Sequence, residues 1–219
     1  MTLLIRLSRR MTARGLDVES VAAGLKSLVA GFIVKPALLA RLGEQGLLPL
    51  RSEGTDKMLI ADLRLEDSVS EVSEVASLSP FVNLVTVTWR LAVSEDWPAV
   101  GKLLSSSGLR PVLAITKYDL GSLGKGAASV VEKAIKSSGI TYVLLPSEGR
   151  EVMGLLLKAI LPAQFIIEDL DLGRGLCLGA KYEVIGQEVL DAEDPVGSVR
   201  MAIYRQRRTA EECLGGVRG

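Results

Sequence analysis

The sequence contains no histidine. Histidine is the usual general base near neutral pH, the base that activates serine and cysteine nucleophiles, and the commonest side-chain ligand of transition metals. Its absence excludes a histidine-based catalytic triad and a histidine-bound metal site. Acid–base chemistry in this chain must therefore use Asp, Glu, Lys, Arg or Tyr side chains.

Cysteine is almost absent as well, since Cys177 and Cys213 are the only two. We expect neither a disulfide framework nor a cysteine zinc site from so few thiols. Long apolar runs are also missing. The start of the chain, MTLLIRLSRRM, has a short apolar run that Arg6 interrupts, and no stretch approaches the roughly 20 apolar residues of a membrane span. We therefore expect a cytoplasmic protein without a signal peptide.

The chain also has no net charge, because its 26 basic and 26 acidic residues cancel. This balance argues against a protein that wraps nucleic acid and against a polybasic membrane binder. The 219 residues, 48% of them hydrophobic, suffice for one large domain with a sizeable core.

Eight short apolar runs rich in β-branched residues recur along the chain. They are LLIRL from Leu3, GFIVK from Gly31, KMLIADL from Lys57, VNLVTVT from Val82, PVLAIT from Pro111, TYVLL from Thr141, QFIIE from Gln164 and YEVIG from Tyr182. Near-continuous apolar runs of this length are typical of parallel strands that are buried on both faces.

Segments with helical periodicity lie between these runs. They are 18–29, 36–47, 69–78, 97–104, 127–135, 151–160 and 195–205. A strand and a helix in roughly every 25–30 residues, repeated eight times, predicts a single-domain (β/α)8 barrel. An open doubly wound sheet is the alternative fold. The segment 168–180 is too short for a full helix and predicts an abbreviated crossover between strands seven and eight. We expect the barrel to occupy 1–208 and 209–219 to form a flexible tail.

The end of the third predicted strand, IADLRLEDS, carries the most informative charges. Alternation along a strand puts Asp62 and Arg64 on one side, and Asp67 follows at the next turn. Functional residues of such barrels sit at the C-terminal ends of strands. Taken alone, however, two carboxylates flanking a cation also fit a salt-bridged strand end without any function.

The segment ADLRLED resembles the Asp-x-Lys-x-x-Asp signature of the orotidine 5'-phosphate decarboxylase superfamily. Three more segments are similar to parts of that family. They are GFIVKPALLARLG (strand two), TYVLLPSEGREVMGLL (strand six) and YEVIGQEVLDAEDPVGSVRMAIYR (strand eight and the last helix). The resemblance covers nearly the whole chain and is most specific at strands three and eight.

The resemblance implies catalytic roles for Asp62, Arg64 and Asp67. In the family, the first Asp stresses the substrate carboxylate, a lysine protonates the carbanion, and the last Asp reaches into the site of a partner subunit. It thus implies a homodimer. We expect no metal and no cofactor. Arg64 replaces the lysine, and a guanidinium is a poor general acid although it can stabilise an anion. The Asp that ends strand one in the family is missing, because LLIRLSRR offers only Ser8.

The resemblance also implies a set of residues that bind the phosphorylated substrate. They are Lys35, Pro146, Ser147, Arg174, Gly175, Gly186 and Gln187. Gln187 replaces a phosphate-binding arginine, and Arg174 in the sequence Leu-Gly-Arg-Gly could restore that cation. The same four residues could equally form only the tight turn of the shortened crossover. The segment ITKYDLGSLGKG after strand five fits either a phosphate-covering lid or a solvated loop.

Two hypotheses for the function follow. The protein decarboxylates orotidine 5'-phosphate to UMP in pyrimidine biosynthesis, or acts on a related phosphorylated substrate. Alternatively, it is an inactive paralogue that binds a nucleotide or phosphate, or acts as a dimeric scaffold, because the lysine, the strand-one Asp and the phosphate-binding Arg are all replaced. Turnover is therefore left open. An aldolase-type relative is disfavoured, because its carboxylate set for a divalent metal is not evident beyond Asp62.

Overall fold

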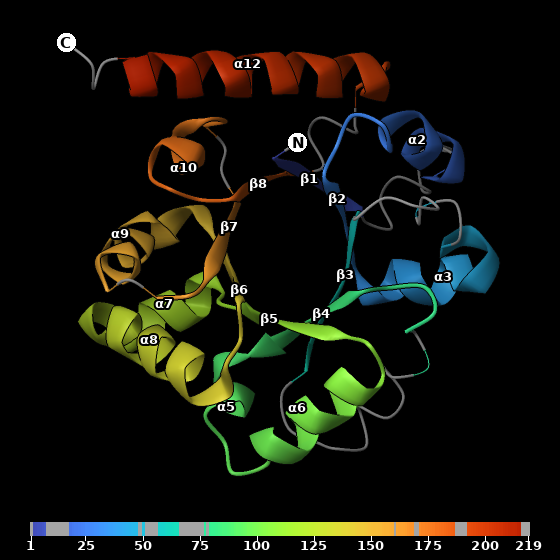
Figure 1. The fold of residues 1–219 in the computed structure, drawn as a ribbon. Coiled ribbons are helices and arrows are strands. Elements are labelled where there is room, and N and C mark those ends of the chain that lie inside the picture. Colours follow the sequence, from blue (N-terminus) through green and yellow to red (C-terminus); the bar gives the residue numbers. More distant parts are fainter. Residues whose placement is uncertain are drawn as a thin grey trace.

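A computed structural model describes residues 2–7, 18–47, 50, 57–65, 77, 79–159, 161–168, 171–186 and 192–215. Parallel strands pair in chain order and form a closed barrel, seen along its axis in Figure 1. The strands are β1 (Leu3–Leu7), β2 (Gly31–Val34), β3 (Met58–Leu65), β4 (Leu84–Thr88), β5 (Arg110–Ala114), β6 (Tyr142–Leu145), β7 (Gln164–Glu168) and β8 (Tyr182–Ile185).

Every apolar run that predicted a strand overlaps one. The pairing of β1 with β8, which places Leu3 beside Glu183, closes the sheet on itself. The predicted (β/α)8 barrel is therefore confirmed, and the open doubly wound sheet is wrong.

There are two apolar clusters, one inside the barrel and one outside it, because successive side chains of a strand point to opposite faces of the sheet. The inner cluster takes one or two residues from every strand and fills the barrel. It consists of Leu4, Ile33, Met58, Ile60, Leu84, Val112, Ala114, Leu144, Ile166 and Val184. The outer cluster, with Leu3, Ile5 and Phe32 among its members, packs the strands against the surrounding helices.

The described helices lie around the barrel (Figure 1). They are α2 (Val18–Leu25), α3 (Pro36–Leu47), α5 (Trp89–Ala92), α6 (Trp97–Ser106), α7 (Lys117–Leu123), α8 (Ala127–Ser138), α9 (Arg150–Lys158), α10 (Arg174–Cys177) and α12 (Pro195–Gly215). The four-residue α10 confirms the abbreviated crossover between β7 and β8. The helix predicted at 69–78 lies outside the described residues, apart from Ser77. No helix of the described part is long and apolar enough to cross a membrane.

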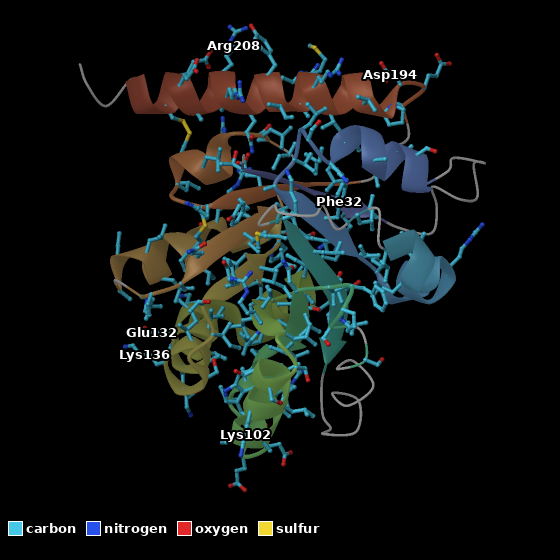
Figure 2. The ribbon with its side chains drawn as sticks, turned by 45° about the vertical axis from the view of Figure 1, so that its right-hand side comes forward. Phe32, Lys102, Glu132, Lys136, Asp194 and Arg208 are labelled. Atoms are coloured by element: carbon cyan, nitrogen blue, oxygen red, sulfur yellow. A yellow bond between two sulfur atoms is a disulfide. The ribbon has the colours of Figure 1, made fainter. Side chains whose placement is uncertain are left out.

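The last helix is longer than predicted. The sequence predicted a helix over 195–205 and a tail from residue 209, whereas α12 continues to Gly215. A disulfide between Cys177 of α10 and Cys213 of α12, with Cα atoms 6.0 Å apart, joins the two helices (Figure 2). The cysteine count gave no indication of this bond, because the two residues are 36 positions apart and meet only through the fold.

Candidate functional site

Charged side chains form a layer at the mouth of the barrel. A residue two positions after an inward-facing one also faces inward, because the side-chain period of a strand is two. Leu4, Ile60 and Ile166 lie in the inner cluster. The same period therefore turns Arg6, Asp62 and Glu168 into the barrel, at the C-terminal ends of β1, β3 and β7.

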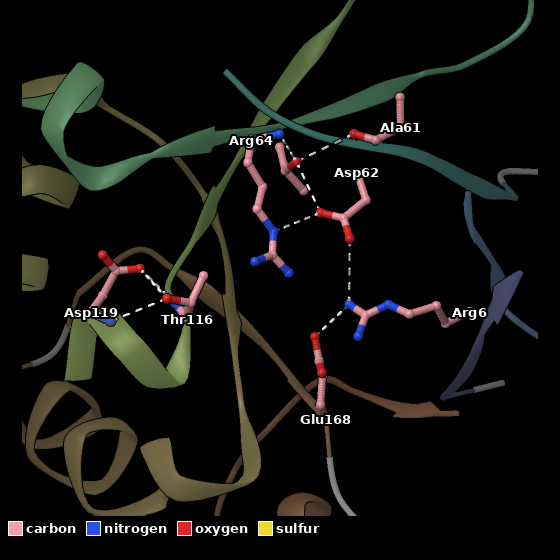
Figure 3. A network of polar contacts seen from close by, with 8 residues as sticks. Arg6, Ala61, Asp62, Arg64, Thr116, Asp119 and Glu168 are labelled. Atoms are coloured by element: carbon pink, nitrogen blue, oxygen red, sulfur yellow. Dashed lines mark hydrogen bonds and ion pairs between the residues drawn. The ribbon is translucent and has the colours of Figure 1, made fainter. Parts of the chain in front are cut away.

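Asp62 is the centre of this layer (Figure 3). Its side chain is almost completely buried, and the residue is 4% exposed. The Oδ1 atom of Asp62 lies 3.3 Å from Nε of Arg64 and accepts a 3.3 Å hydrogen bond from the Thr86 hydroxyl. The Oδ2 atom lies 3.9 Å from Nη2 of Arg6. A buried carboxylate is costly unless it is paired, and Asp62 is met by a guanidinium on each side.

Arg6 is a member of the site that the sequence analysis missed. Its guanidinium donates a short hydrogen bond to Oε1 of Glu168 and also faces Asp62. Burial disfavours the charged guanidinium, but the bond to Glu168 and the charges of Glu168 and Asp62 outweigh it, so the pKa of Arg6 lies above its ordinary value. The chain Arg64–Asp62–Arg6–Glu168 thus alternates in sign. Ser8, the residue considered for the end of strand one, lies outside the described residues.

Arg64 has an unusual backbone conformation. Its φ angle is 52°, which is the left-handed region that non-glycine residues avoid. The pairing of β3 with β4 shifts in register between Ala61 and Leu65, and the amide of Arg64 donates a 2.8 Å hydrogen bond to the Thr86 hydroxyl. Such a conformation costs about 1–3 kcal/mol and persists only where the surroundings enforce it. It is found here at the residue that the sequence resemblance matches to the lysine of the Asp-x-Lys-x-x-Asp signature.

A cavity of about 1060 Å³ opens at this mouth, and its volume is that of a small-molecule site. The cations in its lining are Arg6, Lys35, Arg64, Lys117 and Arg205, and the acids are Glu148, Glu168 and Asp194. Cations therefore outnumber acids in the wall, which favours an anionic ligand.

The cavity brings together some of the predicted site residues and not others. Lys35, Arg64, Pro146, Ser147 and Gly186 line it, and Asp62 is paired with two of its arginines. Arg174 and Gly175 are not in the lining. Asp67 and Gln187 lie outside the described residues. Lys35 follows β2 directly, and the register that pairs Val34 with Ala61 puts it next to Asp62.

The turn that contains Arg174 and Gly175 binds a carboxylate of the protein itself, that of Glu183. Glu183 of β8 points out of the barrel and is 0% exposed. It accepts hydrogen bonds from the amide of Gly173 (2.8 Å) and the amide of Leu176 (3.2 Å). A Cβ atom on Gly175 would lie 2.8 Å from Oε1 of Glu183, so only glycine allows this approach.

The Arg174 side chain, 63% exposed, has its Nε atom 3.8 Å from Asp171. In this arrangement the glycines serve the tight turn of the shortened crossover.

The segment after β5 is helical. α7 begins with a capping box, in which the Thr116 hydroxyl accepts from the Asp119 amide at 3.1 Å and Asp119 accepts from the Thr116 amide at 2.9 Å. Although burial raises the pKa of Asp119, the hydrogen bonds from Thr116 and Trp89 hold it below its ordinary value. Lys117 and Tyr118 line the cavity, and the Tyr118 side chain is 78% exposed. The start of α7 therefore forms part of the cavity wall.

No protein-family model and no curated protein sequence matches this chain. Solved structures do. Orotidine 5'-monophosphate decarboxylase from Sulfolobus solfataricus superimposes with a TM-score of 0.76 at 14% identity, over 95% of this chain and 98% of that one. The enzyme from Metallosphaera sedula gives a TM-score of 0.75 at 18% identity, with the same coverages. The enzyme from Methanocaldococcus jannaschii, complexed with the inhibitor BMP, gives 0.69 at 17% identity, over 94% and 97%.

The chain has the fold of orotidine 5'-monophosphate decarboxylase. This confirms, at the level of the fold, the resemblance that the sequence ADLRLED first indicated. The identities of 14–18% carry the architecture only, so the reaction and the ligand rest on the residues at the barrel mouth.

Proposed function

We propose that this protein is a carboxy-lyase of the orotidine 5'-monophosphate decarboxylase type, acting on orotidine 5'-phosphate or a related phosphorylated compound. The observation that carries the proposal is the buried Asp62, held between Arg6 and Arg64 at a cation-rich cavity. The fold supports it, because decarboxylases of this architecture superimpose on nearly the whole chain. We also propose a cytoplasmic location, as the sequence composition led us to expect, and a place in pyrimidine biosynthesis, which the resemblance suggests.

Asp62 supplies electrostatic stress in this proposal. A substrate carboxylate placed beside the Asp62 carboxylate is repelled in a poorly solvated site, and the repulsion is relieved when carbon dioxide leaves. The bond between the substrate carbon and its carboxylate breaks, and the electron pair stays on the carbon. Arg64, whose side chain is 40% exposed at the cavity, then faces the developing carbanion and stabilises it.

A proton must fill the position that carbon dioxide leaves. A guanidinium releases a proton less readily than an ammonium does, so Arg64 suits charge stabilisation better than proton donation. Lys35 is the lysine next to Asp62 in strand register, and its side chain lines the cavity. We assign proton delivery to Lys35, directly or through water. Pro146, Ser147 and Gly186 contact the ligand in this proposal, together with Gln187, and Asp67 completes the site across a homodimer.

The test is release of carbon dioxide from carboxyl-labelled orotidine 5'-phosphate by the purified protein. The wild type should turn over, and Asp62→Asn should lower kcat by about 10²-fold or more, because it removes the charge that stresses the substrate. Asp96→Asn, an exposed carboxylate before α6, is the matched control and should leave kcat unchanged. A wild type that binds UMP without releasing carbon dioxide would contradict the proposed enzymatic activity and would favour the alternative, a nucleotide-binding paralogue.

A further inference from the structure

Three described backbone amides, at α10 and at the start of α12, already have carboxylate acceptors. Amides at helix starts and glycine turns are the usual cradle for a phosphate. Here Glu183 accepts from the amides of Gly173 and Leu176, and Asp194 accepts from the amide of Gly197 at 2.9 Å. Both turns are thus capped by carboxylates of the chain itself. Because these amides already have acceptors, we look for a donor to the phosphate among the side-chain cations that line the cavity.

α12 presents such a cation. Asp194, Ser198, Met201 and Arg205 line the cavity, and their spacing of three or four residues places them on one face of the helix. The adjacent face is buried, with Val199, Ala202 and Gln206 against the barrel and its helices. Arg205 is therefore turned toward the mouth by the same packing that docks α12.

The position of Arg205 along the helix is fixed by its neighbour. Gln206 donates a 2.9 Å hydrogen bond to the buried Glu183 and accepts one of 3.0 Å from the Thr2 hydroxyl. These bonds tie the middle of α12 to β8 and to the start of β1. The backbone at Arg205 is thus held, while its side chain is exposed and can reach a ligand.

The charge of Arg205 is not used within the described part of the chain. Arg6 and Arg64 pair with Asp62, and Arg6 also pairs with Glu168. Arg205, in contrast, has no ion-pair partner among the described residues. Its guanidinium offers planar, paired donors that match a phosphate monoester.

We infer that Arg205 binds the phosphate of the ligand, from α12 rather than from the end of β8. This inference rests on the proposed function and names the residue that selects phosphorylated ligands at that site. It also accounts for a strand-eight position that carries the uncharged Gln187. Affinity for a phosphorylated compound should then depend on Arg205, and affinity for the corresponding unphosphorylated compound should not.

The experiment is calorimetric titration of the full chain with UMP, uridine and ribose 5-phosphate. Arg205→Ala should weaken binding of UMP and ribose 5-phosphate by about tenfold to a hundredfold, the effect of one charge-assisted hydrogen bond, and leave uridine unchanged. Arg205→Lys should retain part of the affinity. Arg207→Ala, an exposed arginine of the same helix that does not line the cavity, is the control.

The outcomes separate this inference from the proposed function. Loss of phosphate affinity in Arg205→Ala supports the inference even if the wild type releases no carbon dioxide. A variant that binds UMP as the wild type does, or that turns over orotidine 5'-phosphate with an unchanged KM, overturns it while the enzyme stands. A wild type that binds neither UMP nor ribose 5-phosphate at millimolar concentration overturns both.

Discussion

In the proposed mechanism, Arg64 stabilises the carbanion and Lys35 delivers the proton. Arg64 lies in the alternating chain of charges with Asp62, and its left-handed backbone is held by the Thr86 hydroxyl. Lys35 lines the same cavity from the neighbouring strand. The proposal thus assigns charge stabilisation and proton delivery to different side chains, which can be removed separately.

We predict that Lys35→Met lowers kcat by about 10²-fold or more, the usual contribution of a general acid. Arg64→Lys should raise kcat, because an ammonium beside Asp62 transfers a proton more readily than a guanidinium. In the Arg64→Lys background, Lys35→Met should cost less than about tenfold, since the new lysine can deliver the proton. Steady-state kinetics of the four proteins measures this non-additivity. A Lys35→Met variant that keeps the wild-type kcat would contradict the division of tasks.

Individual site residues differed in how far the sequence could predict them. The motif ADLRLED was sufficient to predict Asp62 and Arg64 as site residues. Arg6 could have been predicted as well, because it lies two residues after the inward-facing Leu4 and therefore also faces inward. The φ angle of Arg64 could not have been predicted, because it depends on a register shift against β4 and on the hydrogen bond to Thr86. Arg205 escaped as well, since the face that α12 turns to the cavity depends on the bond between Gln206 and Glu183.

At the level of elements, Glu183 organises the junction of β8, α10 and α12. Its carboxylate accepts from Gly173, Leu176 and Gln206, and it is completely buried. The disulfide between Cys177 and Cys213 joins the same two helices nearer the end of the chain. In a reducing cytoplasm such a bond is rarely maintained, so the hydrogen bonds of Glu183 would hold α12 there without it.

We predict that Glu183→Ala lowers the free energy of unfolding by about 2–4 kcal/mol, because it leaves the buried amide of Gly173, the part-buried amide of Leu176 and the Gln206 amide without their acceptor. Glu183→Gln keeps one carbonyl oxygen and should cost less, about 1–2 kcal/mol. Glu151→Ala, an exposed carboxylate in the first turn of α9, should change stability by less than about 0.5 kcal/mol. Urea denaturation under reducing conditions measures all three. Equal stability of the Ala and Gln variants would show that the hydrogen bonds to Glu183 are not stabilising.

Elements were predictable from sequence where the apolar pattern was strong. The eight strands stood out because both of their faces are largely buried, which makes each of them a near-continuous apolar run. α7 was missed because its glycines suggest a loop, although the Thr116–Asp119 capping box was a local helix signal. The end of α12 was misjudged because its last turns are polar and are held by Cys213, through a contact distant in sequence.

At the scale of the whole molecule, the barrel brings the ends of β1, β3 and β7 together at one mouth. No local sequence pattern predicts that these three ends lie close to one another. Arg6 and Glu168 are 162 positions apart and form an ion pair only because β1 and β7 each flank β8 in the closed sheet. The rhythm of strands and helices predicted the closure itself. Once a closed barrel is assumed, the period of two places Arg6, Asp62 and Glu168 at the mouth, so the fold class carried this charged layer.

The whole molecule also sets the last prediction, which concerns a second copy. The family signature implies that Asp67 acts in the site of a partner subunit, and its sequence neighbours Asp62 and Arg64 lie at the mouth. A C2 dimer would then build each site from Asp62 of one subunit and the partner's Asp67. Sedimentation of the wild type at micromolar concentration should give a dimer, and a monomer would remove the basis for a shared site.

Mixed dimers make the shared site directly measurable. Asp62→Asn and Asp67→Asn should each be inactive alone. In a heterodimer of the two variants, one site combines both substitutions and the other contains neither, so an equal mixture should recover about a quarter of wild-type activity by random pairing. If Asp67 acts within its own subunit, every site in the mixture keeps one substitution and no activity returns. Asp62→Asn mixed with Asp62→Asn/Asp67→Asn is the matched control, because no pairing of these two can form an intact site.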